Sequence, residues 1–298
     1  MDYASKYVDK LSIGKFNLDF GNGPLIMGIL NITPDSFSDG GHFSNCDEAI
    51  AHGLKMANQG AVILDIGPES SRPGSQRVSV AEQIKRATPV IEKLCEKVCI
   101  PISIDTYESK VAAAAIYSGA SIINDITAGS DPGMFRLAAA RDVPIVLMHM
   151  KGSPDNMQIN PTYGNVVEEV LAFLLSRADA AMQAGIKRER IVLDPGIGFG
   201  KTTEHNLALI ASLKRFVDTG FAIVLGASRK RFIGQITGRY VPTERMAGTI
   251  STTIAALNAG VQIVRVHDVP ENLDAIKVAM EIKRYDAICR KHSAGATA

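Results

Sequence analysis

The sequence of 298 residues has no tryptophan, only four cysteines, and an almost balanced formal charge of +1. Without a strong net charge, the chain has no overall field that would attract nucleic acid or an anionic membrane, so any basic site must be local. No apolar run approaches the ~18 residues of a membrane span, and the N-terminus MDYASKYVDK lacks the apolar core of a signal peptide. We therefore expect a cytoplasmic protein.

The cysteines do not form a recognisable ligand set. Cys95 and Cys99 are four residues apart on a predicted helix, and no second pair of ligands completes a zinc site. Reduced thiols of an intracellular protein are the better interpretation. The lack of tryptophan excludes no class of function.

The sequence does contain eight short apolar runs that each end in polar residues. Buried parallel strands read as continuous Val, Ile and Leu runs, and helical segments separate these eight. The length is close to the ~250 residues typical of one (β/α)8 barrel, and no linker divides the chain. We predict an α/β protein, a single-domain TIM barrel over residues 1–298, with strands at 25–30, 61–66, 101–105, 120–125, 143–148, 190–194, 221–226 and 262–267.

Three kinds of segment lie outside this alternation. Residues 1–24 precede the first strand, and KFNLDFGNGP within them predicts a hairpin that plugs the bottom of the barrel. The tail 293–298 is expected to be frayed. The loops after the first, second and fifth strands are longer than the usual four to six or so residues, and long ordered loops are usually functional.

Four polar residues follow the seventh and eighth strands: Ser228, Lys230, Arg265 and His267. Polar groups at the carboxyl ends of barrel strands converge on the face where barrel enzymes hold their active sites, and this set of donors suits a phosphate or diphosphate. Arg265 lies in an apolar strand two residues before His267, so both face the same side. A solvated helix start explains one cation of the run Arg229–Arg231, but not Arg265, whose inward-facing charge favours an anion site.

Three other strand-end residues carry hydrogen-bond acceptors rather than positive charge. They are Asp105, Asn124 and Asp194, which end the third, fourth and sixth strands. A metal cluster is one interpretation, but no His–Asp pairs with metal spacing accompany them. A carboxylate accepts two parallel N–H bonds from an amidine-like edge, and Asn both donates and accepts, so a ring-shaped ligand rich in N–H donors fits better. Asp125 is the best candidate to cap the following helix instead.

Two local features carry less weight. PGIGFGKT at residues 195–202 resembles a P-loop but is one residue short of the required spacing. Close approach of the backbone to a flat ligand explains its glycines better than a dinucleotide fingerprint does. His149, between two methionines, is interpreted as core packing.

Motifs at seven of the eight strand ends together resemble the dihydropteroate synthase family. In chain order they are MGILNITPDSFSDGG, SIDT, IIND, LMHM, LDPGIGFGK, SRK and RVHD, and they span nearly the whole chain. The resemblance implies condensation of 6-hydroxymethyl-7,8-dihydropterin diphosphate with 4-aminobenzoate, which yields 7,8-dihydropteroate and diphosphate in folate biosynthesis. It also implies a Mg²⁺-dependent homodimer that sulfonamides target.

The resemblance also assigns residues to the two substrates. The pterin is expected to contact Asp105, Asn124, Met148, Asp194, Phe199, Gly226 and Lys230. The diphosphate is expected to contact Asn31, Ser228, Arg265 and His267, with Asn31 as the protein ligand of Mg²⁺. The 4-aminobenzoate pocket is expected to contain Phe37, Ser71, Arg72, Pro73 and Lys230.

The implied route is dissociative and SN1-like. Diphosphate leaves first, and the amine then attacks a cation that is delocalised into the pterin ring. Fixed positive groups and Mg²⁺ act where charge develops on the leaving group. The residues implied in catalysis are Asn31, Asp35, Lys230, Arg265 and His267, with Asp35 stabilising the cation when the first loop closes over it.

The second loop departs from the family pattern, and two other functions stay open. Pro68 replaces the usual Gly and stiffens the backbone, while Ser71 replaces Thr but retains the hydroxyl. These changes concern aminobenzoate affinity and sulfonamide sensitivity rather than the reaction class. The alternatives are a methyltetrahydrofolate-binding methyltransferase domain, which needs no diphosphate anchor, and a catalytically silent pterin-binding protein.

Overall fold

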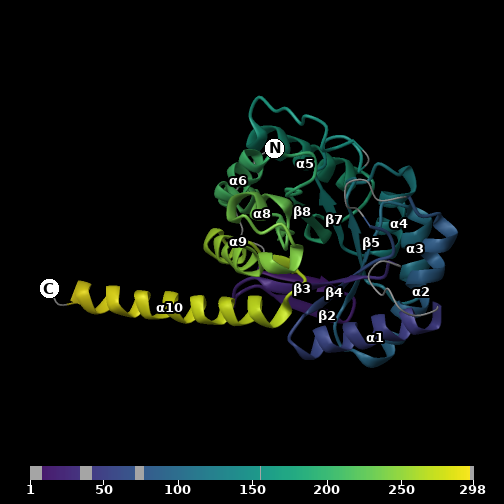
Figure 1. Cartoon of the computed structure of the whole chain (residues 1–298), viewed down its shortest axis with the longest axis horizontal. Coiled ribbons are helices and arrows are strands. Elements are labelled where there is room, and N and C mark those ends of the chain that lie inside the picture. Colours follow the sequence, from purple (N-terminus) through teal and green to yellow (C-terminus); the bar gives the residue numbers. More distant parts are fainter. Residues whose placement is uncertain (1–8, 34–41, 71–76, 155, 296–298) are drawn as a thin grey trace.

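The computed structural model describes residues 9–33, 42–70, 77–154 and 156–295. Eight parallel strands close into one barrel in the order β10-β3-β4-β5-β6-β7-β8-β9, and helices surround it (Figure 1). The predicted (β/α)8 architecture is confirmed. The strands are β3 (Leu25–Asn31), β4 (Ile63–Gly67), β5 (Ile102–Asp105), β6 (Ile122–Asp125), β7 (Ile145–Met148), β8 (Ile191–Asp194), β9 (Ala222–Leu225) and β10 (Ile263–Val266).

Helices separate the strands, as the predicted alternation requires. Ser212, whose φ of −104° interrupts the helical geometry, divides the helical segment between β8 and β9 into two. The helices are α1 (His42–Asn58), α2 (Val80–Lys97), α3 (Ser109–Tyr117), α4 (Pro132–Arg141), α5 (Val166–Gln183), α6 (Thr203–Ala211), α7 (Leu213–Val217), α8 (Arg231–Thr237), α9 (Met246–Ala259) and α10 (Val269–Gly295), with 3-10 turns at Arg188–Arg190 and Pro242–Arg245.

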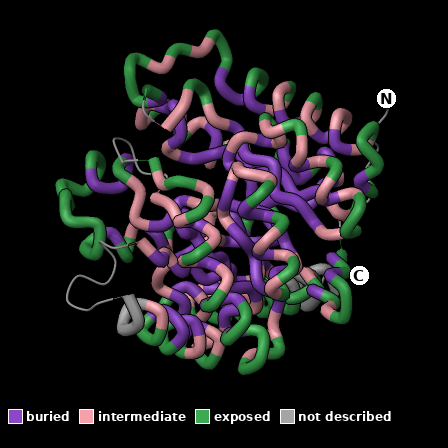
Figure 2. The backbone as a smooth tube through the Cα atoms, turned by 90° about the vertical axis from the view of Figure 1, so that its right-hand side faces the viewer, coloured by how far each residue is buried: buried purple, intermediate pink, exposed green. Residues whose placement is uncertain are grey.

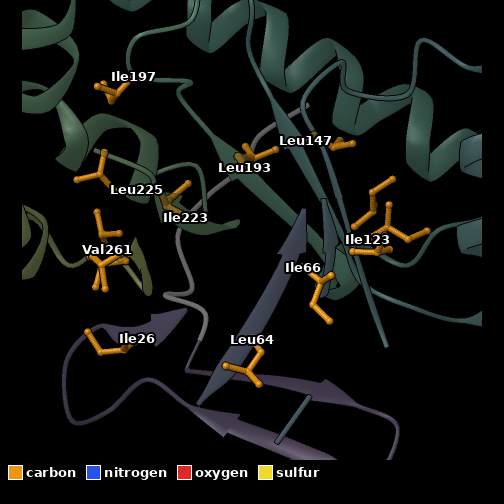
Figure 3. Close-up of a cluster of buried hydrophobic side chains, with 14 of the residues drawn as sticks. Ile26, Leu64, Ile66, Ile123, Leu147, Leu193, Ile197, Ile223, Leu225 and Val261 are labelled. Atoms are coloured by element: carbon orange, nitrogen blue, oxygen red, sulfur yellow. The ribbon is translucent and has the colours of Figure 1, made fainter. Parts of the chain in front are cut away.

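Successive residues of each strand point to opposite sides of the barrel wall. The outward-facing side chains form the main core beneath the helices; Figure 3 labels Ile26, Leu64, Ile66, Ile123, Leu147, Leu193, Ile223 and Leu225 among them. The inward-facing side chains form a second core, with Met27, Ile63, Ile122, Val146, Val192, Ala222, Val224 and Ile263. This layer fills the lower barrel, so only its upper end can bind a ligand.

The N-terminal hairpin closes the bottom of the barrel. Its strands are β1 (Lys10–Ile13) and β2 (Phe16–Asp19), and Leu11, Ile13 and Leu18 pack against the inward-facing layer. The predicted plug is confirmed, but its predicted bounds are wrong. The hairpin starts at Lys10 because alternating apolar residues there supply the first strand, and it turns at Gly14, where φ is 55°.

Helix α10 projects well beyond the barrel (Figure 1). It continues to Gly295, so the tail predicted to fray from residue 293 is helical for three residues more, and residues 296–298 lie outside the described part. Buried residues concentrate in the central barrel and beneath the helices (Figure 2). In the described part of the chain, no helix combines the length and apolar character needed to cross a membrane.

Candidate active site

The carboxyl ends of the strands open into a cavity of about 700 Å³. Asp105 lies opposite Asn124 in the β5–β6 register, and Met148 lies opposite Asp194 in the β7–β8 register. The predicted site residues that line the cavity are Asn31, Asp105, Phe199, Gly226, Ser228, Lys230, Arg265 and His267. The predictions for Asp35, Phe37, Ser71, Arg72 and Pro73 fall outside the described residues.

Arg265 is held between two carboxylates. Its Nε donates to Asp65 Oδ2 at 2.6 Å, and Nη2 donates to Asp105 Oδ2 at 2.8 Å. The guanidinium carries five N–H donors, so others remain for a ligand in the cavity. The inward charge expected from the sequence is therefore present, and it is hydrogen-bonded to carboxylates of two other strands.

Asp65 was not among the predicted site residues. It is fully buried in β4, and its Oδ2 also accepts a hydrogen bond from Asn124 Nδ2 at 3.0 Å. This contact uses one of the two N–H donors of the Asn124 amide and fixes its orientation, so the amide oxygen is available to accept from a ligand. The signal in the sequence was a charged residue inside the apolar run AVILDI, the same pattern that singled out Arg265.

Asp194, like Asn124 and Met148, is not in the cavity lining itself, but one of its carboxylate oxygens lies next to Gly226, which is. Its Oδ1 accepts a hydrogen bond from the Gly196 N–H at 2.7 Å. Its Oδ2 lies near Gly226, and a Cβ added to that glycine would be 3.8 Å from this oxygen. Burial raises the pKa of Asp194, although the Gly196 hydrogen bond and the nearby cations Lys230 and Arg265 oppose that rise. Hydrogen-bonded N–H groups of a ligand would stabilise the ionised form further.

The electrostatics of Asp105 give a prediction about stability. Burial raises its pKa from 3.8 to about 7 against the opposing charge of Arg265, and Asp65 contributes to the rise. A carboxyl that binds its proton more tightly when folded stabilises the protein fully below about pH 4, and this contribution is lost as the pH rises through about 7. The unfolding free energy of the ligand-free protein is therefore expected to fall over this range. Urea unfolding at a series of pH values, with Asp105→Asn as the reference, measures it; equal slopes in both proteins would contradict the assignment.

The groups proposed for the anion lie together at the ends of β9 and β10. Ser228 Oγ lies 2.9 Å from His267 Nδ1 and accepts from the His267 backbone N–H at 3.2 Å. Between Ser228 and Lys230, Arg229 adopts a left-handed φ of 57°, and its Nε donates to Asp268 at 3.0 Å. This ion pair holds a strained turn that presents Ser228 and Lys230 on either side of it.

An apolar surface lies beside these polar groups. Met148 and Phe199 pack with Ile126 and Met157 in a small cluster. The Lys230 ammonium lies 4.0 Å from the centroid of the Phe199 ring, a cation–π contact. A flat ring bound between the polar strand ends would pack one of its faces against this cluster.

The structure corrects one expectation for the neighbouring loops and limits another. Asp125 does not cap α4; it accepts from the backbone of Thr127 and Gly129 in the turn after β6, and Asp131 caps α4 instead. Close approach of protein backbone explains Gly196 and Gly200, while Gly198 lines the cavity and retains the prediction of close approach to a ligand. A Cβ added to Gly196 would lie 1.9 Å from the His149 carbonyl oxygen, and one added to Gly200 would lie 2.3 Å from that of Lys151.

The fold and this site define a barrel enzyme that binds a polar ring beside an anion. Residues 27–267 match the family model described as pterin binding enzyme. A dihydropteroate synthase from Synechocystis sp. is 42% identical over 281 residues, which cover 94% of this chain and 97% of the relative. The chain belongs to the dihydropteroate synthase family of pterin-binding enzymes.

Solved structures of this family share the fold closely. The dihydropteroate synthase of Xanthomonas albilineans with 4-aminobenzoic acid superposes with a TM-score of 0.88 at 43% identity and covers 92% of this chain and 98% of its own. The same enzyme in complex with 7,8-dihydropteroate gives a TM-score of 0.84 at 41% identity, with the same coverage. The pocket at the strand ends therefore lies on a scaffold that holds one substrate and the product in these relatives.

Proposed function

We propose that the protein is a transferase that condenses 6-hydroxymethyl-7,8-dihydropterin diphosphate with 4-aminobenzoate to give 7,8-dihydropteroate and diphosphate, in folate biosynthesis. The observation that carries this proposal is that Arg265, which is hydrogen-bonded to Asp105, lines the same cavity as Ser228 and His267. Hydrogen-bond acceptors for a heterocycle and donors for an anion thus lie next to one another, as a pterin diphosphate requires.

The strand ends bind the pterin in this proposal. Asp194 Oδ2 and the Asn124 amide oxygen accept its N–H groups, while Asp105 and Lys230 meet the other polar edges. Met148, Phe199 and Gly226 contact its two faces. Because Asp105, Asn124, Met148 and Asp194 sit on strands whose register is set by the barrel, they hold the exocyclic methylene at a constant distance from the anion groups.

The anion groups stabilise the leaving diphosphate. Negative charge builds on the leaving group as its bond to the methylene carbon breaks, and the cationic Arg265 and the donors Ser228 and His267 already face that position. The amine of 4-aminobenzoate is neutral at pH 7 and attacks the resulting cation without a strong base. We assign Asp35 to stabilise that cation, and Phe37, Ser71, Arg72 and Pro73, with Lys230, to hold the aminobenzoate.

Asn31 is the residue that would hold Mg²⁺. Among the residues the structure describes, no cluster of three or more His, Cys, Asp or Glu could hold a metal ion. Mg²⁺ however retains several waters and takes few protein ligands when substrate phosphates supply the rest. Asn31 lies opposite Gly67 in the β3–β4 register, and an added Cβ on Gly67 would lie 3.1 Å from Asn31 Oδ1, so the glycine preserves space beside this oxygen. When bound, the ion would neutralise charge on the diphosphate.

Turnover tests the proposal directly. The purified chain is mixed with Mg²⁺, the dihydropterin diphosphate and 4-aminobenzoate, and both dihydropteroate and diphosphate are followed. Equal release of the two products is expected. Diphosphate without dihydropteroate would mean that the second loop, with Pro68 and Ser71, does not hold the amine. Binding of pterin without either product would contradict the synthase and favour the methyl-carrier alternative.

We further propose a homodimer, and we retain the prediction of a cytoplasmic location. Support for the dimer comes from the projecting α10, where Val278, Ile282 and Tyr285 are 60%, 65% and 60% exposed. Their spacing places them on one stripe of the helix. Light scattering is expected to give twice the chain mass of 31.9 kDa.

A charged substitution in this stripe tests whether the stripe forms the dimer interface. Ile282→Lys is expected to shift the protein toward the monomer, because it would bury an unpaired ammonium in the interface. Tyr117→Lys, which places the same charge at an 88% exposed residue of α3 away from α10, is the matched control and is expected to leave the mass unchanged. A monomeric wild-type chain at all concentrations would reject the dimer.

A further inference from the structure

Lys201, the last residue of PGIGFGK, is a buried cation for which the proposed chemistry has no use. Only 3% of it is exposed. Its ammonium lies 2.9 Å from His149 Nδ1, 3.3 Å from the His149 carbonyl oxygen and 2.9 Å from the Phe199 carbonyl oxygen. An ammonium has three N–H donors, so these three acceptors use all of them and none remains for a substrate.

The neutral state of His149 fits this arrangement, whereas burial opposes the charge of Lys201. Burial, together with the charge of Lys201, lowers the pKa of His149 to about 3, so the ring is neutral and Nδ1 can accept the hydrogen bond. Burial lowers the pKa of Lys201 to about 7, opposed by Asp194 and assisted by Lys230. A lysine kept in such a costly position by three acceptors is expected to serve the geometry of its neighbours.

Two of the three contacts, those to His149, join two loops of the barrel mouth, and the third, to the Phe199 carbonyl, lies within one of them. We call residues 195–202 the β8 loop and residues 149–165 the β7 loop. Two further hydrogen bonds cross between them, from Tyr163 Oη to the Gly200 carbonyl oxygen at 2.8 Å and from Gln158 Nε2 to the Gly198 carbonyl oxygen at 2.6 Å. The close backbone approach at Gly196 and Gly200 is possible because those residues lack a side chain.

Phe199 sits at the centre of this junction. Its carbonyl oxygen is bound by Lys201, while its ring packs against Met148 and lies beneath the Lys230 ammonium. Fixing the carbonyl of a residue with positive-φ glycines on either side restricts a backbone that would otherwise have unusual freedom. The direction of the ring therefore depends on the contact with Lys201.

We propose that Lys201 is a positioning residue that ties the β8 loop to the β7 loop and thereby sets the face that Phe199 presents to the pterin. The inference rests on the proposed function, because it takes the pterin as the ligand of Phe199. It assigns Lys201 no contact with the reacting atoms. It also explains why a glycine-rich loop that resembles a P-loop ends in a buried lysine without binding a phosphate through it.

The test measures binding of 6-hydroxymethylpterin, which lacks the diphosphate, by calorimetry. Lys201→Met retains the length of the side chain but removes the ammonium, and it is expected to raise the dissociation constant by about tenfold, the size of one lost hydrogen bond to a charged group. In steady-state turnover, KM for the pterin diphosphate is expected to rise more than kcat falls. Lys214→Met, an exposed lysine on α7, is the matched control and is expected to change neither.

Measuring the effect of Lys201→Met in a second protein, the Phe199→Leu variant, distinguishes a positioning role of Lys201 from a general loss of structure. If Lys201 acts through Phe199, then Lys201→Met is expected to have little further effect on pterin affinity in a Phe199→Leu protein. Equal losses in both backgrounds, or a Lys201→Met protein that binds pterin like the wild type, would overturn the proposal. Absence of pterin binding by the wild type would instead reject the proposed function.

If Lys201→Met does not fold, a milder variant, Tyr163→Phe, tests the proposed role of the junction between the two loops. Tyr163→Phe removes one hydroxyl from the same junction and retains the ring that packs beside His149 and His205. It is expected to weaken pterin binding by a smaller factor in the same direction. An unchanged dissociation constant for this variant would overturn the role of the junction.

Discussion

Replacing Arg265 by alanine is expected to lower the unfolding free energy by about 3–5 kcal/mol, because it removes the partner of a buried carboxylate. Asp65 is fully buried and the Asp105 side chain is 13% exposed; neither donates a hydrogen bond when ionised, so the two would face each other without a cation between them. Urea unfolding at pH 7 measures this cost. An unchanged midpoint would contradict the role of Arg265 as the link between the two carboxylates.

The same variant is expected to weaken binding of the pterin diphosphate by about 100-fold or more, since charge-assisted hydrogen bonds to the anion are lost. Free pterin is expected to lose less, through the disturbed Asp105 alone. Equal losses for the two ligands would reject the assignment of Arg265 to the diphosphate.

Two other variants show whether the effects of Arg265→Ala come from the lost charge, from the lost hydrogen bonds to the two carboxylates, or from lower stability in general. Arg265→Lys retains the charge but cannot bridge two carboxylates with a planar fork, so an intermediate stability is expected. Arg177→Ala is a matched control, because Arg177 bonds two backbone carbonyl oxygens, of Ala128 and Gly129, from helix α5. It is expected to lower stability while leaving both affinities unchanged.

Asp194→Asn is expected to reduce pterin affinity by about 100-fold with little change in the fold. The substituted amide is nearly isosteric, but its oxygen is needed by the Gly196 N–H, which turns the amide nitrogen toward the ligand. A donor would then face the N–H groups of the pterin, which we propose are bound by the carboxylate oxygen. Calorimetry with 6-hydroxymethylpterin measures the change, and an unaltered affinity would remove Asp194 from the pterin site.

Asp125→Asn provides the comparison for this result. Asp125 also ends a strand and is fully buried, but it accepts hydrogen bonds within the turn after β6 rather than facing the cavity. Its amide variant is expected to lower the unfolding free energy and to leave pterin affinity unchanged. Together the two variants distinguish loss of binding from loss of stability.

Much of this site could be predicted because strand ends in a parallel barrel meet at one face regardless of their partners. Asp105, Asn124, Asp194 and Arg265 were identified from polar residues that end or interrupt apolar runs. Asp65 carries the same signal and was not assigned. The motif that ends in Lys201 was recognised as a departure from the P-loop, but its spacing does not reveal what the lysine binds.

The local patterns of the chain were sufficient to predict the barrel, its plug and the face that carries the polar groups, because each depends on hydrophobic periodicity along short segments. The pairing of those polar groups depends on the closed barrel. Arg265 meets Asp65 and Asp105 across 200 and 160 residues, and Lys201 meets His149 across 52. Only closure of the strands, with its particular register, brings side chains so distant in sequence within hydrogen-bonding range, and these contacts decide which of their atoms remain available to a substrate.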